Sequence, residues 1–267
     1  MSTRYYAKET ERWRIKADTD TDPSSPRNEY GNIGTILLPH GLGDNGMDIG
    51  SDAYRDMFEA CYIVPMEVIE GMVGYYIGPY GYLEVDDNGI YHTTDGSWWD
   101  CSDEGTMMLL FLDIVDNIEL HDVIRICNDD VPRFYDNKLF YRYLSLQCGP
   151  YDYLRTSETD TVNQYLGIIW TTSETVSDKL SCGTLNTETI LSFLDNEVSE
   201  YAAYLAGDVY AATIERLGKW GWEAVDMIGG FINESEDEMF AAAEEMYNLN
   251  GYQVSQVKNM WRRRDVV

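Results

Sequence analysis

Carboxylates near the start of the chain copy part of the spacing of a calcium-binding loop. Asp18, Asp20 and Asp22 alternate with threonines, and Glu29 follows eleven residues after Asp18, as some ligands of that loop do. Pro23, however, occupies the position at which the loop requires a glycine for its sharp turn. We therefore expect a solvated acidic turn here rather than a calcium site.

His40 is the histidine best placed in the sequence to act as a general base, because Asp44 and Asp48 follow it closely. A carboxylate that orients an imidazole is typical of general-base catalysis. The chain has only two other histidines and lacks the G-x-S-x-G, P-loop and H-E-x-x-H motifs. The sequence thus favours a structural, hydrogen-bonded role for His40.

A metal-dependent enzyme stays open as an alternative function, and a divalent cation is the only cofactor that the sequence suggests. In that case hard oxygen ligands and one imidazole would come together. The residues that would bind the cation are Asp18, Asp20, Asp22, Glu29, His40 and Asp44.

Aromatic and acidic residues also alternate around Trp98. Asp95, Trp98, Trp99 and Asp100 lie within six residues, a composition found in sugar-binding sites. An aromatic core beside a turn explains the same residues, and we expect that simpler arrangement.

Two predicted helices in the C-terminal third carry many carboxylates. The first has an apolar stripe between Ile190 and Leu205, begins at a Thr187 cap and ends at Gly207. Carboxylates three or four residues apart on a helix lie about 5–6 Å apart at Cβ, close to the spacing of successive phosphates along a nucleic-acid strand. The acidic faces consist of Glu188, Asp195, Glu197 and Glu200 on the first helix and Glu234, Glu236, Asp237, Glu238, Glu244 and Glu245 around the second.

The formal net charge is −28, far beyond the magnitude of about 2–8 that keeps a small domain soluble. Such a charge repels nucleic acid and anionic membranes and attracts basic proteins. Three explanations stay open, namely a cationic partner, a high-salt habitat and the ordinary variation in charge among acidic proteins. The scarcity of lysine, with six lysines against thirteen arginines, favours the high-salt habitat. The basic tip from Lys258 to Arg264 is either a frayed tail or a clamp on an acidic face of this chain or of a second copy in a homodimer.

The compartment is expected to be the cytosol. The five cysteines form no CxxC pair, which favours buried free thiols in a reducing environment. The N-terminus has no apolar segment of a secretory signal, and the most apolar run, residues 107–112, is too short to cross a bilayer. We expect a soluble protein that binds neither membranes nor nucleic acid directly.

The pattern of apolar residues predicts an α+β fold. We expect a mixed or antiparallel sheet of short strands and hairpins with a few amphipathic helices, two of them C-terminal. Residues 62–93 read as strands and turns, whereas residues 107–118 fit either a buried helix or two short strands. The segments 1–100, 101–164 and 165–267 are expected to be an N-terminal part, an insertion and a C-terminal part, unless one continuous domain spans 1–267.

Four stretches of the sequence resemble a family of uncharacterised phage and mobile-element proteins. They are Ser25-Pro26-Arg27 with Asn32-Ile33-Gly34-Thr35, His40 and Leu42-Gly43-Asp44; Tyr82 to Ile90 with Trp99-Asp100; residues 167–172; and residues 201–210. The resemblance covers about half of the chain and excludes residues 101–164. It implies a viral or mobile-element origin and no particular reaction.

Charge and resemblance together predict a non-enzymatic anti-defence protein. Its carboxylates would replace phosphates in the DNA- or RNA-binding groove of a basic host protein, such as a defence nuclease or a CRISPR-type complex. Exposed aromatic side chains would anchor the interface. The alternatives are the metal-dependent enzyme and an acidic protein of a halophile with an unrelated function.

Overall fold

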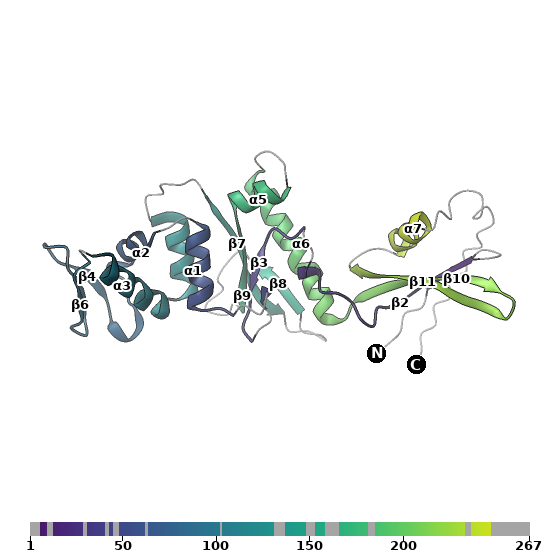
Figure 1. Cartoon of the computed structure of the whole chain (residues 1–267), viewed down its shortest axis with the longest axis horizontal. Coiled ribbons are helices and arrows are strands. Elements are labelled where there is room, and N and C mark those ends of the chain that lie inside the picture. Colours follow the sequence, from purple (N-terminus) through teal and green to yellow (C-terminus); the bar gives the residue numbers. More distant parts are fainter. Residues whose placement is uncertain are drawn as a thin grey trace. The chain divides into compact units, whose positions relative to one another are not determined.

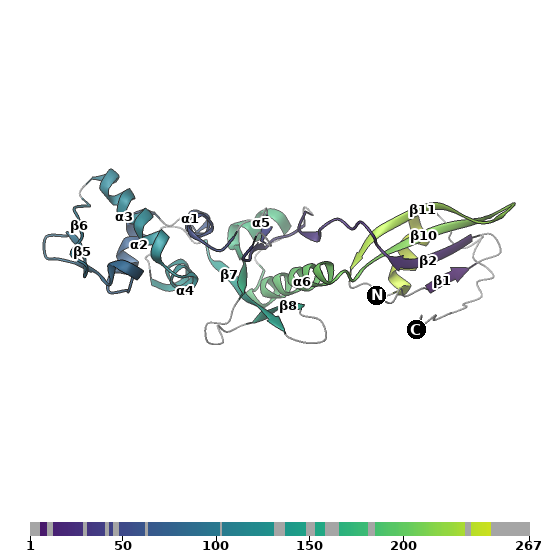
Figure 2. The same cartoon turned by 90° about the horizontal axis from the view of Figure 1, so that it is seen from below.

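The computed structural model describes residues 6–9, 13–28, 31–40, 43–44, 48–61, 64–101, 103–130, 137–147, 153–157, 166–180, 185–232 and 236–246. In these residues the chain forms seven α-helices and three antiparallel sheets (Figures 1 and 2), so the predicted α+β class is confirmed. The helices are α1 (Ser51–Ala60), α2 (Pro65–Met72), α3 (Glu104–Asn117), α4 (Leu120–Arg125), α5 (Ser173–Leu180), α6 (Thr187–Ala206) and α7 (Glu236–Met246). The strands are β1 (Tyr6–Glu9), β2 (Trp13–Thr19), β3 (Thr35–Leu37), β4 (Leu83–Val85), β5 (Tyr91–Thr93), β6 (Trp98–Trp99), β7 (Leu139–Gln147), β8 (Tyr153–Ser157), β9 (Gly167–Thr172), β10 (Val209–Gly218) and β11 (Gly221–Ile232).

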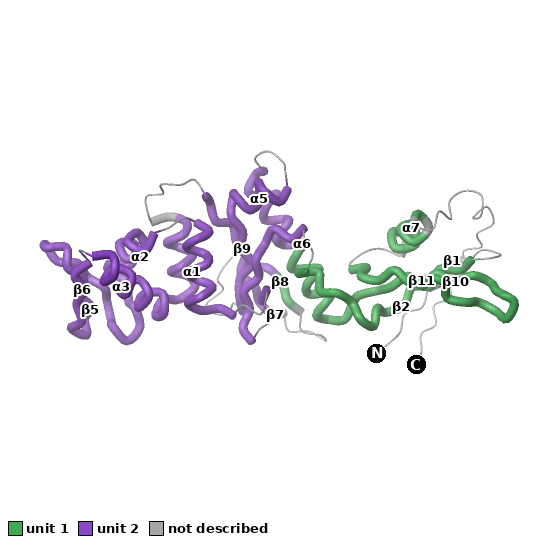
Figure 3. The backbone as a smooth tube through the Cα atoms, in the orientation of Figure 1, with its two compact units in different colours: residues 1–30, 147–155, 197–267 green, residues 31–146, 156–196 purple. Residues whose placement is uncertain are grey.

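The chain divides into two compact units, which Figure 3 shows in different colours. Unit 1 comprises residues 1–30, 147–155 and 197–267, and unit 2 comprises residues 31–146 and 156–196. Each of the predicted segments 1–100, 101–164 and 165–267 therefore contributes residues to both units.

Unit 1 is built on a four-stranded sheet in the order β1-β2-β10-β11. β10 and β11 form a hairpin around Lys219 and Trp220, and β2 pairs with β10 although about 190 residues separate them in the sequence. Helix α7 lies over this sheet, where Met239, Phe240 and Ala243 pack against apolar side chains of β2 and β10. One face of the sheet and one face of the helix thus share a small core.

Unit 2 contains the larger core, to which helices α1 to α4 and strands of two sheets contribute side chains. One of these sheets has the order β3-β9-β7-β8, of which β8 begins within the residues of unit 1. All six residues of its inner strand β9 are buried. The short sheet β4-β5-β6 covers another side of the core, together with α2 and α3. The Asp87-Asn88-Gly89 turn joins β4 to β5, with Gly89 at φ 81°.

The prediction of strands and turns throughout residues 62–93 is wrong for one segment, because residues 65–72 form α2. Pro65 begins the helix at a position that needs no backbone donor, and the Glu67 carboxylate accepts a hydrogen bond from the Val64 amide. Val68, Ile69 and Met72 recur at helical spacing and are fully buried. The β-branched pair within this run favours a strand only when the helix-start signals are ignored.

Residues 107–118, for which the sequence left helix and strand open, are helical and belong to α3. The predicted helix α6 is confirmed, and Gly207 follows it at φ 74°. Its cap is one residue earlier than predicted, since Asn186 rather than Thr187 accepts the Thr189 amide. Leu205, predicted to lie in the apolar stripe, is exposed, because the helix ends one residue later.

The described cysteines are free thiols, of which Cys61 and Cys127 are buried and Cys101 is partly exposed. Within the described residues, no helix is long and apolar enough to cross a membrane.

Candidate protein-binding site

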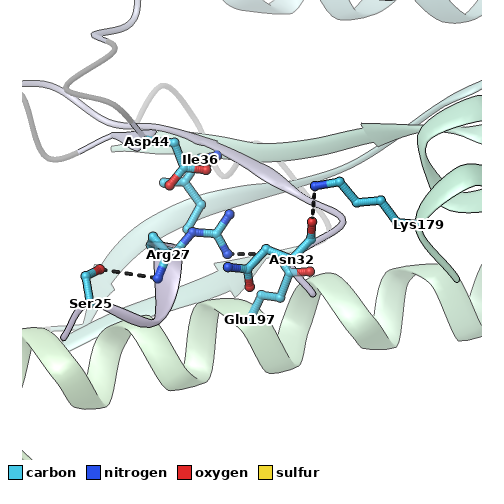
Figure 4. A network of polar contacts seen from close by, with 7 residues as sticks. All are labelled: Ser25, Arg27, Asn32, Ile36, Asp44, Lys179 and Glu197. Carbon is cyan, nitrogen blue, oxygen red and sulfur yellow. Dashed lines mark hydrogen bonds and ion pairs between the residues drawn. The ribbon is translucent and has the colours of Figure 1, made fainter. Parts of the chain in front are cut away.

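The carboxylates predicted on α6 do not form a free acidic row. Asp195 accepts a hydrogen bond from Arg142 (Nε–Oδ1, 3.3 Å), and Glu197 pairs with Arg27 (Nη1–Oε2, 2.7 Å), as Figure 4 shows for the second pair. Successive helical residues are rotated by about 100°, which places these two side chains at the flanks of the buried stripe rather than opposite it. Glu188 and Glu200 are exposed.

Helix α7 presents outward those carboxylates whose side chains the structure describes. Asp237, Glu238 and Glu245 are exposed and lie on the side of the helix opposite Met239 and Ala243. Glu234 and the side chains of Glu236 and Glu244 lie outside the described part of the chain, as does the basic tip from Lys258 to Arg264.

The proposed metal ligands in unit 1 are used locally by the backbone. Asp18 lies in β2 and accepts the Thr19 amide, whereas Asp20 accepts the amides of Asp22 and of Gly230 in β11. These bonds connect the end of β2 to the outer strand of the same sheet. The carboxylates therefore have a structural role in the turn after β2.

The proposed metal ligands in unit 2 are not gathered either. Asp44 accepts the Ile36 amide of β3 at 2.9 Å, and His40 is exposed at φ 64°. Glu29 lies outside the described residues. Within the described residues, no group of three or more histidine, cysteine, aspartate or glutamate side chains could hold a metal ion.

A stretch of unit 2 contains no lysine or arginine at all. Between Arg55 and Arg125 the sequence has 69 residues (56–124), which include 15 carboxylates and no Lys or Arg. We call residues 56–124 the cation-free segment. It contains α2, α3 and the sheet β4-β5-β6, and among its carboxylates only Glu67 and Asp122 are buried. The absence of lysine and arginine from this segment is visible in the sequence, but the acidic faces predicted on the C-terminal helices do not include it.

The sheet β4-β5-β6 turns one face to the core and the other to solvent. Leu83, Tyr91 and Thr93 are buried, and the Tyr91 hydroxyl lies 3.8 Å from Met66 Sδ of α2. Trp99 packs edge-on against Tyr80 and also contacts the core. This packing fixes the sheet, so that alternation along the strands decides which side chains face outward.

The outward side chains form a compact aromatic and acidic surface. Glu84 is paired with His92, and His92 with Trp98, so that the three lie in one row across the strands. Tyr82 lies two residues before Glu84 on the same side, and its ring contacts that of Tyr76 edge-on, with 5.7 Å between the ring centroids. We call Tyr76, Tyr82, Glu84, His92 and Trp98 the aromatic face; Trp98 is 64% exposed.

Turns at the edges of this sheet hold their carboxylates in the charged form. Hydrogen bonds from the backbone of Ile90 and Asn88 and from His92 lower the pKa of Asp86 to about 2. A hydrogen bond from the Thr93 hydroxyl, and then one from the Ser97 amide, lower the pKa of Asp95. These groups carry full negative charge at neutral pH.

Sequence reasoning named Asp95, Trp98, Trp99 and Asp100 together, and the structure separates them. Trp99 contributes to the core, as expected, whereas Trp98 faces solvent. Asp95 closes the turn between β5 and β6, and Asp100 is exposed just after β6. The surface therefore combines the exposed indole ring of Trp98 with the carboxylate of Asp95, which hydrogen bonds hold in place.

Comparisons of the chain with protein-family models, with curated proteins and with solved structures find no match.

Proposed function

We propose that the protein is an acidic inhibitor that occupies the nucleic-acid-binding groove of a basic host protein. The observation that carries this proposal is the cation-free segment, in which 15 carboxylates occur in 69 residues without one Lys or Arg. An ordinary acidic surface intersperses both signs of charge. A continuous segment of one sign is expected where the partner supplies the opposite charge.

The fixed carboxylates of the segment support binding by electrostatic attraction. Asp86 and Asp95 are ionised at neutral pH, as exposed aspartates are, and hydrogen-bond donors lower the pKa of both carboxyls further. Such a field speeds the encounter with a cationic partner and weakens with salt, since the screening length is about 8 Å at physiological ionic strength.

The aromatic face adds apolar contacts that exclude water, which the electrostatic attraction of the carboxylates does not provide. Protein interfaces are enriched in tyrosine and tryptophan, and a few such anchors carry most of the binding energy. Tyr76, Tyr82 and Trp98 are all exposed beside carboxylates. An interface centred on this face would therefore combine anchors with a charged rim.

The identity of the partner as a host defence protein draws on the resemblance to phage and mobile-element proteins. A defence nuclease or a CRISPR-type complex in the host cytosol has the phosphate-binding groove that such an acidic protein would block. The proposal requires neither a catalytic residue nor a bound metal in this chain.

The test begins with capture of partners from a bacterial lysate on the tagged protein, followed by purification of the captured protein. Displacement of a fluorescent DNA or RNA duplex from that protein is then measured over a range of salt concentrations. We expect displacement by the wild-type protein that weakens as salt rises. Failure to displace any nucleic acid, or displacement that salt does not affect, would contradict the proposal.

Matched double variants locate the surface. Glu84→Gln with Asp87→Asn removes two exposed charges from the cation-free segment, and Asp237→Asn with Glu245→Gln removes two exposed charges from α7. We expect the first pair to weaken displacement about ten-fold, the equivalent of about 1.4 kcal/mol, and the second to change it less. An equal loss in both variants would show that net charge acts without a defined surface.

A further inference from the structure

The chain itself shows how it binds a guanidinium group. In unit 1 the guanidinium of Arg14 lies 4.8 Å from the centroid of the Trp222 ring, while its Nε donates to Glu215 at 2.6 Å. The guanidinium of Arg125 likewise lies 3.7 Å from the centroid of the Tyr75 ring. An aromatic ring beside a carboxylate is thus a site that an arginine of this chain occupies.

The aromatic face has the ring and the carboxylates of such a site without the cation. Trp98 and Tyr82 are exposed, and Glu84 lies in the same row as Trp98, on the other side of His92. The surrounding segment contains no Lys or Arg that could cover the rings. Within the described residues, no cationic side chain stacks on Trp98.

We propose that the aromatic face is a binding site for arginine side chains of the partner, which stack on Trp98 and Tyr82 and form ion pairs with Glu84 and Asp86. This inference rests on the proposed function and specifies which cations of the partner are bound. A guanidinium is planar and weakly hydrated, and it can stack on a ring while its edge donates to a carboxylate. A lysine ammonium is strongly hydrated and offers a point charge instead.

Charge decides between an arginine-rich partner and a neutral sugar for the same rings. A sugar needs an aromatic platform and a few hydrogen-bonding groups, and it gains nothing from a field of unbalanced carboxylates. A guanidinium gains from each nearby negative charge, and the segment carries 15 of them against no Lys or Arg. The phosphate-binding groove of a nucleic-acid-binding protein presents such side chains.

The rigidity of the face favours binding, because little side-chain or loop freedom is left to lose. The turn from Asp86 to Ile90 is closed by three hydrogen bonds to the Asp86 carboxylate from the amides of Asn88 and Ile90 and from the His92 ring. The Tyr82 amide donates to Thr94 Oγ1 on the neighbouring chain segment. The Asp86 carboxylate and the backbone of Tyr82 are thus held in place before a partner arrives, and the Tyr82 ring rests against that of Tyr76.

The experiment compares fluorescein-labelled octa-arginine with octa-lysine, which carry equal charge, in binding to the full chain by fluorescence anisotropy at physiological salt. We expect the arginine peptide to bind about two- to five-fold more tightly, the equivalent of about 0.5–1 kcal/mol. Trp98→Ala should abolish this preference. Trp220→Ala, which removes a tryptophan that is 87% exposed on the β10–β11 hairpin, should keep it.

The remaining outcomes separate this inference from the proposed function. Equal affinity of both peptides for the wild-type protein would overturn the arginine site and leave an inhibitor that acts by charge alone. Binding of neither peptide would overturn both proposals. Binding of neutral oligosaccharides that Trp98→Ala abolishes, without an arginine preference, would assign the face to a sugar ligand instead.

Discussion

Gly167 shows how a single position without a side chain permits the close approach of two strands. It begins β9, and a Cβ atom there would overlap the carbonyl oxygen of Leu37 in β3 and lie 2.8 Å from Leu38 Cδ2. Backbone atoms in a buried sheet cannot move aside as a flexible side chain can.

We predict that Gly167→Ala lowers the free energy of unfolding by about 1–3 kcal/mol, the usual cost of overpacking a core. Urea unfolding followed by circular dichroism measures it. Gly31→Ala is the control, because a Cβ at Gly31 meets nothing within 4 Å, and it should leave stability unchanged or raise it by up to about 1 kcal/mol. A Gly167→Ala protein as stable as the control would show that β3 and β9 are not so close.

Glu215 is the buried carboxylate of the sheet in unit 1, and two cations hold it. Arg14 Nε lies 2.6 Å from Oε2, and Lys16 Nζ lies 2.7 Å from Oε1. Burial raises the pKa of Glu215, but hydrogen bonds from Lys16 and Arg14 outweigh it, so that the pKa is lowered overall. A carboxyl whose pKa is lower in the folded state stabilises the fold above its unfolded pKa of about 4.3 and loses this contribution as the pH falls through its folded pKa.

Glu215→Gln should therefore lower the free energy of unfolding at neutral pH by about 1–3 kcal/mol, because two cations lose a charged partner. The gap to the wild-type protein should narrow as the pH falls below about 4, which urea unfolding at several pH values would measure. Glu223→Gln, at an exposed position of β11, should change stability by less than about 0.5 kcal/mol. A gap that is independent of pH would assign the effect of Glu215 to packing.

At the scale of elements, the sequence predicts those helices and turns that depend on the local spacing of apolar residues and glycines. Helix α6 follows from apolar periodicity and from the position of Gly207, and it lies where the pattern predicts it. The cap of α6 was missed by one residue because asparagine and threonine both favour that position, and only the structure shows which side chain reaches the Thr189 amide.

Asn186→Ala tests this assignment at the start of α6. We expect the free energy of unfolding to fall by about 0.5–2 kcal/mol, since the Thr189 amide loses its side-chain acceptor. Thr187→Ala, one residue further on, should change it by less than about 0.5 kcal/mol. Thermal unfolding of both variants would measure the difference, and a larger loss in Thr187→Ala would restore the cap predicted from the sequence.

The pairing of strands that lie far apart in the sequence could not be predicted from the local pattern of residues. Nothing in β2 and β10 alone indicates that Ile15 lies opposite Ile214 or Arg14 opposite Glu215. The same holds for the aromatic face, because Tyr76, Glu84 and Trp98 share one side only after three strands have paired in a particular register. The composition of the segment was readable from the sequence, whereas the surface it forms was not.

At the scale of the whole molecule, a net charge of −28 opposes folding through self-repulsion. Among the described residues, cations pair with carboxylates such as Asp195, Glu197 and Glu215 and offset part of this repulsion. The cation-free segment has no such relief from within, although lysine or arginine could stand at its exposed positions at no cost in packing. The exposed carboxylates of this segment repel one another, and we infer that the protein keeps them because they take part in binding.

Removal of that charge should therefore stabilise the protein and impair its function together. We predict that Glu84→Gln with Asp87→Asn raises the melting temperature at low salt, because both carboxylates are exposed and none of their neighbours in the segment is Lys or Arg. The gain should shrink as salt screens the repulsion, while displacement of nucleic acid from the partner weakens. Differential scanning fluorimetry across salt concentrations measures the first effect.

The same salt series separates an inhibitor from a protein adapted to brine. The wild-type protein should unfold cooperatively even at about 20 mM salt, where the screening length is about 20 Å, with a melting temperature that rises as salt is added. A halophile's protein would instead be unfolded in that buffer and fold only at molar salt. Such a result would show that the charge is an adaptation to high salt. The variant Glu84→Gln with Asp87→Asn would then fold at lower salt than the wild-type protein, without any loss of binding.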